Sequence, residues 1–499
     1  MFMNKKYFEN TRFNGIFLTL ILILIAYRFI SLAETSLWLD EMMQVQIAQT
    51  PTIKDILTYL PKDKPPIEYL LLMFISKIGK SDYLLRLPAC IFGILILIPI
   101  FYFLRKYFNK NHLYLFFIFS VLLLSHPLHF FMSQQLLPYS DTTLWLTVFM
   151  VSAIGWVETR LKSLLFLTII STIFAFMTVY VSIFSIAAII IGLILGMILN
   201  VKNKSKFIKA YLAGFSIWSL VMTILMIFFY WRMHTKFKEP PPPWSFQNLS
   251  GLIIILKESF IGKFNNIYLS YIAVSLELIL FLFGLFKISK EKEIYKYVIL
   301  SWLFLGLALF LFAFLKSNHW LSVRYFLPFI IPYTLIQAIG LFSIYELINR
   351  KNIRVGQIFL VCILLYIMIY RYEPLRNLRT TLIPNFRQEV EKMVYSDQAS
   401  ICLIDHDYTK YCYNYYKIMR YSSIPEGLVF DPNSSEQMKN ISALKSIYIF
   451  PITADGFILN ENFSKILKNY TGKKISPQEI IQYYNINKIN KDFDKSPLK

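Results

Sequence analysis

The sequence predicts an all-α protein that crosses a membrane many times and ends in a small soluble α/β domain. Of its 499 residues, 56% are hydrophobic and 16% are charged, a composition too apolar for a soluble protein of this length. Apolar runs of about 20 residues, the length that crosses about 30 Å of hydrocarbon, recur from Leu18 to Tyr370. The residues after this region are mainly polar, which predicts the soluble domain.

The orientation of the spans follows from the basic residues, since short cytoplasmic loops carry an excess of Lys and Arg. Five basic clusters and Lys5-Lys6 are placed inside, which puts the N-terminus in the cytoplasm and the C-terminus outside. Gly15 to Leu32 is interpreted as a retained first helix, because no small-residue cleavage site clearly follows it. About eleven spans result, or twelve to thirteen helices if re-entrant segments are counted: 14–32, 87–104, 112–132, 141–158, 163–180, 182–200, 208–231, 268–287, 296–315, 325–347 and 355–371.

One apolar segment, Pro65 to Ile78, is too short for an ordinary span and has Lys and Pro at its ends. Counting it as a span would place the later basic clusters outside, so it is predicted to be a re-entrant or interfacial helix. Four exoplasmic features follow, namely a first loop at 33–86, a turn at 133–141, a loop at 232–267 and a turn at 316–324.

The domain boundary is predicted at residue 372, with a transmembrane domain over 1–372 and a soluble exoplasmic domain over 373–499. Two short apolar runs in the second domain, Ile401 to Ile404 and Ile447 to Phe450, predict strands. Asn385 to Ser396, Thr409 to Tyr421 and Ser476 to Tyr484 predict helices. This alternation favours a small α/β domain.

The formal net charge of +21 does not indicate a nucleic-acid partner, because the basic residues are scattered between apolar spans instead of gathered in one soluble domain. Topology signals and contact with anionic membrane lipid explain them better. The predicted location is a plasma membrane, and high Lys, Ile and Asn usage favours a bacterial inner membrane.

The first exoplasmic loop opens with Trp38, Leu39, Asp40 and Glu41. A carboxylate here suits removal of a proton from an attacking nucleophile, provided that nearby cations stabilise a leaving phosphate. Asp40 is therefore the predicted base, and Glu41 is a second acidic candidate. The structural alternative is that both residues only cap a helix beginning at Met42, since Asp is a favoured N-cap residue.

Other polar residues are predicted at the same exoplasmic face, and charges near bilayer depth are functional candidates by default. Lys64 precedes Pro65-Pro66 at the start of a helix, a favourable place for a phosphate. Each candidate also has a purely structural explanation as an interfacial anchor or a turn residue. The candidates for phosphate contact are Lys64, Arg86, Arg324 and Tyr325, and those for lining a cavity are Gln135, Tyr139, Asp141, Lys316 and His319.

No cofactor is predicted with certainty. The histidines show no strong metal-ligand spacing, although a divalent ion held by Asp40, Glu41 and Asp141 stays open as an alternative. The sequence contains neither a Gly-rich phosphate loop nor a Ser-His-Asp arrangement that can be argued.

Leu37-Trp38-Leu39-Asp40-Glu41, Lys64-Pro65-Pro66 and Leu85-Arg86-Leu87-Pro88 together resemble the GT-C glycosyltransferases. The chain is most similar to the group with the protein O-mannosyltransferases and the bacterial aminoarabinose transferase of lipid A. The resemblance runs from Trp38 to about Asp141 and resumes at Arg324-Tyr325-Phe326-Leu327-Pro328. Relatives often carry Glu or His just before the Pro-Pro segment, whereas this chain has Lys62-Asp63-Lys64, which puts a metal contact from this loop in doubt.

The resemblance implies a GT-C architecture and an inverting transfer of a sugar from a polyprenyl-phosphate or dolichyl-phosphate donor. It implies Asp40 as the catalytic aspartate and Lys64 as a donor-phosphate contact, with Arg86, Tyr139, Asp141 and Arg324 lining the cavity. The expected acceptor is an exoplasmic lipid, glycan or protein. Two other hypotheses remain, a transporter or flippase of lipid-linked saccharides and a non-catalytic subunit of an envelope complex.

Overall fold

A computed structural model of the chain describes 11–34, 37, 39–61, 64–108, 111–200, 204–233, 249–291, 293–317, 322–382 and four short strands. The chain divides into two compact units. The first contains Met1–Leu32 and Ile47–Leu378, and the second contains Ala33–Gln46 and Arg379–Lys499.

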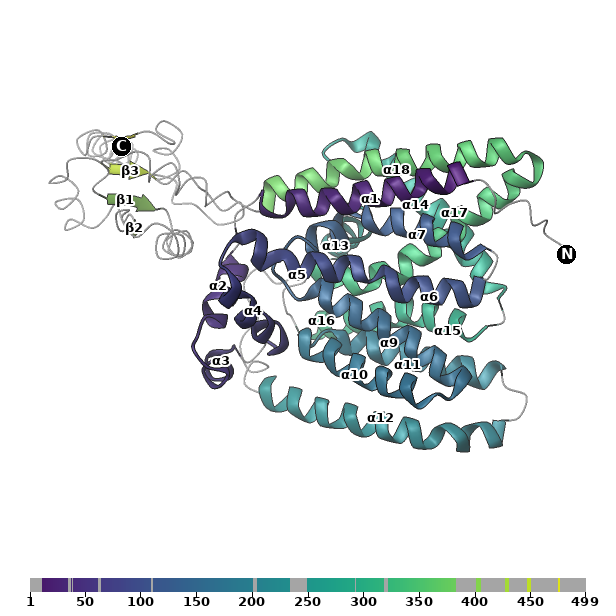
Figure 1. The fold of residues 1–499 in the computed structure, drawn as a ribbon, viewed down its shortest axis with the longest axis horizontal. Coiled ribbons are helices and arrows are strands. Elements are labelled where there is room, and N and C mark those ends of the chain that lie inside the picture. The colour runs from purple at the N-terminus through teal and green to yellow at the C-terminus, as the bar shows by residue number, and fades with distance from the viewer. Residues whose placement is uncertain are drawn as a thin grey trace, which may run out of the picture. The chain divides into compact units, whose positions relative to one another are not determined.

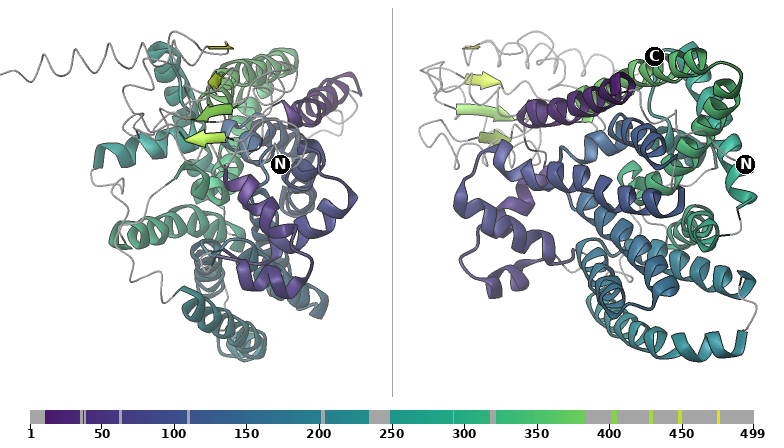
Figure 2. Two further views of the ribbon diagram at one scale, coloured as in Figure 1. Left: turned by 90° about the vertical axis from the view of Figure 1, so that its left-hand side faces the viewer. Right: turned by 45° about the vertical axis from the view of Figure 1, so that its right-hand side comes forward.

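The first unit is a bundle of helices, in which the long helices run roughly side by side (Figures 1 and 2). Its long helices are α1 (Thr11–Ile30), α9 (Tyr139–Thr159), α10 (Lys162–Thr178), α11 (Ser182–Asn200), α12 (Lys204–Met233), α14 (Ile267–Ser289), α17 (Leu327–Lys351) and α18 (Ile353–Leu382). The shorter ones are α3 (Ile53–Tyr59), α4 (Ile67–Ile78), α5 (Asp82–Leu95), α6 (Leu97–Phe108), α7 (His112–Leu124), α8 (Pro127–Met132), α13 (Leu249–Phe260), α15 (Ile294–Leu300) and α16 (Gly306–Ser317). A π-helical turn η5 (Ser301–Leu305) joins α15 to α16, a 3-10 turn η6 (Val323–Phe326) leads into α17, and a 3-10 turn η2 (Ser31–Ala33) follows α1.

Eight helices in the described part of the chain are long and apolar enough to cross a membrane. They are Gly15–Ala33, Asp82–Phe108, Tyr139–Thr159, Ser182–Leu199, Ile267–Ser289, Ile294–Phe314, Val323–Lys351 and Ile353–Leu375. Three shorter apolar helices, His112–Leu124, Lys162–Thr178 and Ser216–Phe228, overlap three further predicted spans. The multi-pass helical architecture is therefore confirmed, while the number of spans stays a prediction.

Helix α17 occupies the centre of the bundle, and 89% of the most apolar 18-residue stretch of Val323–Lys351 is buried. It packs along α14, where Gly284 lies against the carbonyl of Ile336 and Gly340 lies against the carbonyl of Leu280. Small residues allow two helix backbones to approach closely inside a membrane. This pair of glycines therefore sets the α14–α17 contact.

The segment predicted to be a short re-entrant or interfacial helix is α4, which begins directly after Pro65-Pro66. Helix α3 precedes it and has a capping box formed by Thr52 and Asp55. The two helices share an apolar cluster of Ile56, Leu60, Tyr69 and Met73, and they lie at one end of the bundle (Figure 1).

One predicted span is wrong in detail. The structure does not continue a single helix over 112–132 but ends α7 at Leu124 and starts α8 at Pro127. Proline lacks the N–H that a continuous helix would need and fits the first turn of a new one. Helix α18 continues to Leu382, beyond the predicted span end at residue 371.

The second unit contains most of helix α2 (Leu39–Ala48) and four strands, β1 (Ile401–Ile404), β2 (Gly427–Val429), β3 (Ile447–Ile449) and β4 (Lys474–Ile475). The strand order is β2-β1-β3-β4, in which β1 pairs in parallel with β2 and β3, and β3 pairs antiparallel with β4. Strands β1 and β3 lie where the sequence predicted them. The three predicted helices of this region lie outside the described residues, so the α/β domain as a whole stays a prediction.

Candidate functional site

Lys64 and Glu68 lie at the start of α4, on either side of the two prolines. Pro66 is the N-cap residue of the helix, and the backbone N–H of Lys64 donates to the carbonyl of Pro61 at 3.0 Å. Lys64 is half-buried. Because helix N-termini attract anions, the half-buried Lys64 ammonium and the start of α4 together suit a phosphate group.

Glu68 and Asp141 form a pair of buried carboxyl groups from different helices. Glu68 is 5% exposed and Asp141, in the first turn of α9, is 3% exposed. Burial, and secondly the neighbouring charge of Asp141, raise the pKa of Glu68 to about 8. The Oδ1 atom of Asp141 has no hydrogen-bond partner among the described residues. Two buried carboxyls near one another disfavour double ionisation, so at neutral pH Glu68 holds its proton.

Tyr139, Arg324 and Tyr325 come together from the start of α9 and from η6. The ring centroids of Tyr139 and Tyr325 are 5.9 Å apart, and the guanidinium carbon of Arg324 lies 5.6 Å from the ring centroid of Tyr325. Arg324 is buried. Asp141 lies in the same first turn of α9 as Tyr139. The structure therefore brings Arg324 and Tyr325, two predicted phosphate contacts, close to the segment that carries two predicted cavity residues.

Arg86 and Gln135 are also buried in this unit. Arg86 lies in α5 and donates from Nη1 to the carbonyl of Leu32 at 3.3 Å. Gln135 follows α8, and its side-chain Oε1 has no hydrogen-bond partner among the described residues.

The remaining predicted site residues belong to the second compact unit, to α16 or to the part of the chain that is not described. Asp40 and Glu41 belong to the second compact unit, where they lie in the first turn of α2. Since α2 begins at Leu39, neither residue precedes the helix as the capping alternative required. Lys316 lies in α16, whose last side chains are not described, and His319 is outside the described residues. The proximity of Asp40 to Lys64 therefore stays a prediction.

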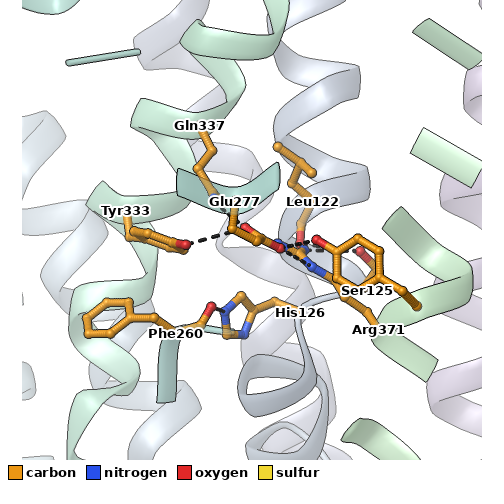
Figure 3. A network of polar contacts seen from close by, with 9 residues as sticks. Leu122, Ser125, His126, Phe260, Glu277, Tyr333, Gln337 and Arg371 are labelled. Atoms are coloured by element: carbon orange, nitrogen blue, oxygen red, sulfur yellow. Dashed lines mark hydrogen bonds and ion pairs between the residues drawn. The ribbon is translucent and has the colours of Figure 1, made fainter. Parts of the chain in front are cut away.

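A network around Glu277 was not among the predicted candidates (Figure 3). Arg371 donates to Glu277 Oε1 from Nε at 3.0 Å and from Nη2 at 2.7 Å. Tyr370 donates to the same oxygen, while Gln337 and Tyr333 donate to Oε2, the latter at 3.3 Å. A Glu inside an apolar run and an Arg at the end of another are the sequence signals that could have found it.

Glu68 was likewise missed as a candidate, although a carboxylate two residues after Pro66 in an apolar helix is a detectable signal. No group of three or more His, Cys, Asp or Glu side chains in the described residues is arranged to hold a metal ion.

The sequence matches no protein-family model and no curated protein. Among solved structures, ArnT from Cupriavidus metallidurans in the apo state has a TM-score of 0.58 at 10% identity, covering 92% of this chain and 96% of ArnT. The same protein bound to undecaprenyl phosphate has a TM-score of 0.53 at 10% identity, covering 88% and 93%. The oligosaccharyltransferase of Archaeoglobus fulgidus in the apo form has a TM-score of 0.49 at 10% identity, covering 93% of this chain and 69% of its own.

The likeness to ArnT confirms the predicted GT-C architecture. At this identity the likeness concerns the fold alone, since one fold can carry many functions.

Proposed function

We propose that this chain is an integral membrane inverting glycosyltransferase. It takes a sugar from a polyprenyl-phosphate donor and transfers it to an exoplasmic lipid, glycan or protein acceptor. The observation that carries the proposal is the gathering of Glu68 with Asp141, and of Tyr139 with Arg324 and Tyr325, in a chain with the ArnT fold. The ArnT structure with bound undecaprenyl phosphate supports the choice of lipid carrier.

In the proposed reaction, Asp40 takes the proton of the acceptor as the acceptor atom bonds to the anomeric carbon. The bond from this carbon to the phosphate oxygen breaks, and its electron pair leaves with the polyprenyl phosphate. Attack from the face opposite the leaving group inverts the anomeric carbon. Glu41 assists as a second acidic contact.

The developing charge on the phosphate has to be stabilised by cations. Lys64 supplies a point charge beside the α4 N-terminus, and Arg324 supplies a planar guanidinium that can bind two phosphate oxygens at once. Tyr325 contributes a phenol hydroxyl, and Arg86 contributes positive charge from α5. Gln135, Tyr139 and Asp141 are proposed to line the sugar-binding part, together with Lys316 and His319.

The test is transfer by the purified full-length protein in lipid nanodiscs, with a panel of radiolabelled undecaprenyl-phosphate hexoses and pentoses and a membrane extract as acceptor. We expect wild type to release undecaprenyl phosphate and to label the acceptor, and Asp40→Asn to lose at least 100-fold in rate. Asp55→Asn is the matched control, since Asp55 lies in the same loop and its carboxylate is engaged in the α3 cap. Equal labelling by wild type and Asp40→Asn would refute the proposal.

A further inference from the structure

Helix α7 ends inside the bundle, and the four carbonyls of its last turn would be left without helical partners. The backbone N–H of Ser125 donates to the carbonyl of Val121 at 3.0 Å, and that of His126 to the carbonyl of Leu123 at 3.1 Å. The other two carbonyls accept from arginines of distant helices. Arg371 Nη1 donates to the carbonyl of Leu122 at 2.5 Å, and Arg28 Nη2 donates to that of Leu124 at 2.8 Å.

The two arginines differ in their charge environment. Arg371 is neutralised by Glu277, whereas the partners of Arg28 among the described residues are uncharged. These partners are the carbonyl of Leu124, Ser133 Oγ, His129 Nδ1 and the ring of Phe130, whose centroid is 4.9 Å away. A fully buried cation without a carboxylate is costly, so retaining Arg28 requires a reason beyond capping α7.

Arg28 also fixes the turn that follows α8. Its Nη1 donates to Ser133 Oγ at 2.5 Å, and Gln134 Nε2 donates back to the Arg28 carbonyl at 3.0 Å. Gln134 Nε2 also donates to Ser31 Oγ at 2.5 Å. A Cβ on Gly93 would lie 2.7 Å from the Cβ of Ser133 and 3.4 Å from Nη1 of Arg28, so this neighbour must be a glycine. Two successive turn residues are thus tied to the last turn of α1.

His129 contacts the guanidinium of Arg28, and this contact fixes the tautomer of the imidazole. Its Nδ1 lies 2.9 Å from Arg28 Nη2, and an arginine can only donate. Nδ1 must therefore accept, and the imidazole is neutral with its proton on Nε2. A protonated His129 would direct an N–H at the guanidinium and break this contact.

We propose that Arg28 is a positioning residue for sugar transfer: it holds the turn between α8 and α9 and thereby the placement of Gln135, Tyr139 and Asp141. The anchored residues Ser133 and Gln134 directly precede Gln135, whose Oε1 is buried without a partner among the described residues. The inference deepens the proposed function and rests on it for the role in sugar transfer. The anchoring of the turn by Arg28 can be tested without any activity.

The first experiment measures local opening of the turn. Leu136, 1% exposed in the same turn, is replaced by cysteine, and its reaction with a maleimide is followed by peptide mass spectrometry in full-length protein in nanodiscs. We expect at least a tenfold faster reaction when Arg28→Lys is added, since a lysine cannot serve three acceptors with a rigid fork. Ser171→Cys, a buried position on α10, is the reference site and should react at an unchanged rate.

Arg371→Lys is the matched control, because it weakens the other α7 cap without touching the turn. It should leave the Leu136→Cys rate unchanged. Ser133→Ala is the second variant, which deletes a single anchor and should accelerate labelling by about threefold. An unchanged Leu136→Cys rate in both Arg28→Lys and Ser133→Ala overturns the proposal, and so does equal acceleration at Leu136→Cys and Ser171→Cys.

The second experiment measures transfer. Arg28→Lys should lower kcat at least tenfold with a smaller change in the donor KM, because the proposed phosphate contacts Lys64, Arg86 and Arg324 are kept and only the placement of the sugar is loosened. A loss confined to KM would contradict the positioning role. If wild type transfers no sugar from any donor, the proposed function fails, whereas the labelling experiment still decides whether Arg28 holds the turn.

Discussion

Arg371 and Glu277 form a buried ion pair between α18 and α14, with Nη2 and Oε1 2.7 Å apart and each side chain 1% exposed. Removing one partner of a buried pair leaves the other charge without compensation, which costs about 3–5 kcal/mol. We therefore expect Glu277→Ala and Arg371→Ala each to lower the unfolding temperature strongly in nanodiscs.

The control for this prediction is the Lys106–Glu158 pair, whose side chains are 42% and 23% exposed. Exposed pairs contribute about 0–1 kcal/mol, so Lys106→Ala should change the unfolding temperature little. If Glu277→Ala lowers the unfolding temperature as little as Lys106→Ala does, the buried network is not a main source of stability.

The α14–α17 contact gives a second prediction. A Cβ on Gly284 or Gly340 would overlap a backbone carbonyl of the facing helix, and overpacking costs about 1–3 kcal/mol. Gly284→Ala and Gly340→Ala should both destabilise the protein in thermal unfolding. Gly15→Ala is the control, since no atom lies within 4 Å of its added Cβ. If Gly340→Ala leaves the unfolding temperature unchanged, α14 and α17 can move apart without a loss of stability, which contradicts the prediction.

The pKa of Glu68 gives a pH prediction. It rises from 4.5 to about 8 in the folded protein, so between these values the folded state keeps a proton that the unfolded state has released. Stability consequently falls as the pH rises through this range. Glu68→Gln removes this dependence and should gain up to about 4 kcal/mol over wild type between pH 5 and pH 8. If the unfolding free energies of wild type and Glu68→Gln change with pH in parallel, the raised pKa of Glu68 is contradicted.

A fourth prediction concerns the donor phosphate. Lys64→Gln removes one cation at the start of α4, and a hydrogen bond to a charged group contributes about 1.5–3 kcal/mol. We expect the KM for the lipid-phosphate donor to rise roughly tenfold to a hundredfold, with partial recovery in Lys64→Arg. Lys54→Gln, on the exposed side of α3, should leave this KM unchanged.

The fifth prediction concerns orientation. Alkaline phosphatase, which is active only outside the cytoplasm, should be active when fused after Lys499 and inactive when inserted in the basic cluster from Lys202 to Lys209. The opposite pattern would invert the predicted topology and place the candidate site at the cytoplasmic face.

Much of the architecture was predictable because it depends on local composition. Long apolar runs mark α1, α9 and α17, and Pro65-Pro66 marks the start of α4. Strand β1 follows from the apolar run Ile401 to Ile404. The α7–α8 break had a signal in Pro127, but the surrounding apolar residues favoured a single span.

The pairing of polar side chains was not predictable in the same way. Arg28, Glu277 and Arg371 stand out as charges in apolar runs, yet their partners come from helices far away in the chain. Glu68 became a candidate only when packing placed it near Asp141. Tertiary contacts, which a single sequence does not display, decide these pairs.

The capping of α7 by two arginines also bears on how the protein is made. During synthesis α1 and α7 enter the membrane well before α18, so until Arg371 has been translated the carbonyl of Leu122 has the 3.4 Å hydrogen bond from Ser125 Oγ but lacks the shorter one from Arg371. Weakly satisfied backbone groups are costly in hydrocarbon. The α7–α8 junction therefore gains its full set of hydrogen bonds only when α18 docks, which makes this junction a late checkpoint of assembly and a marker of whether a truncated chain has matured.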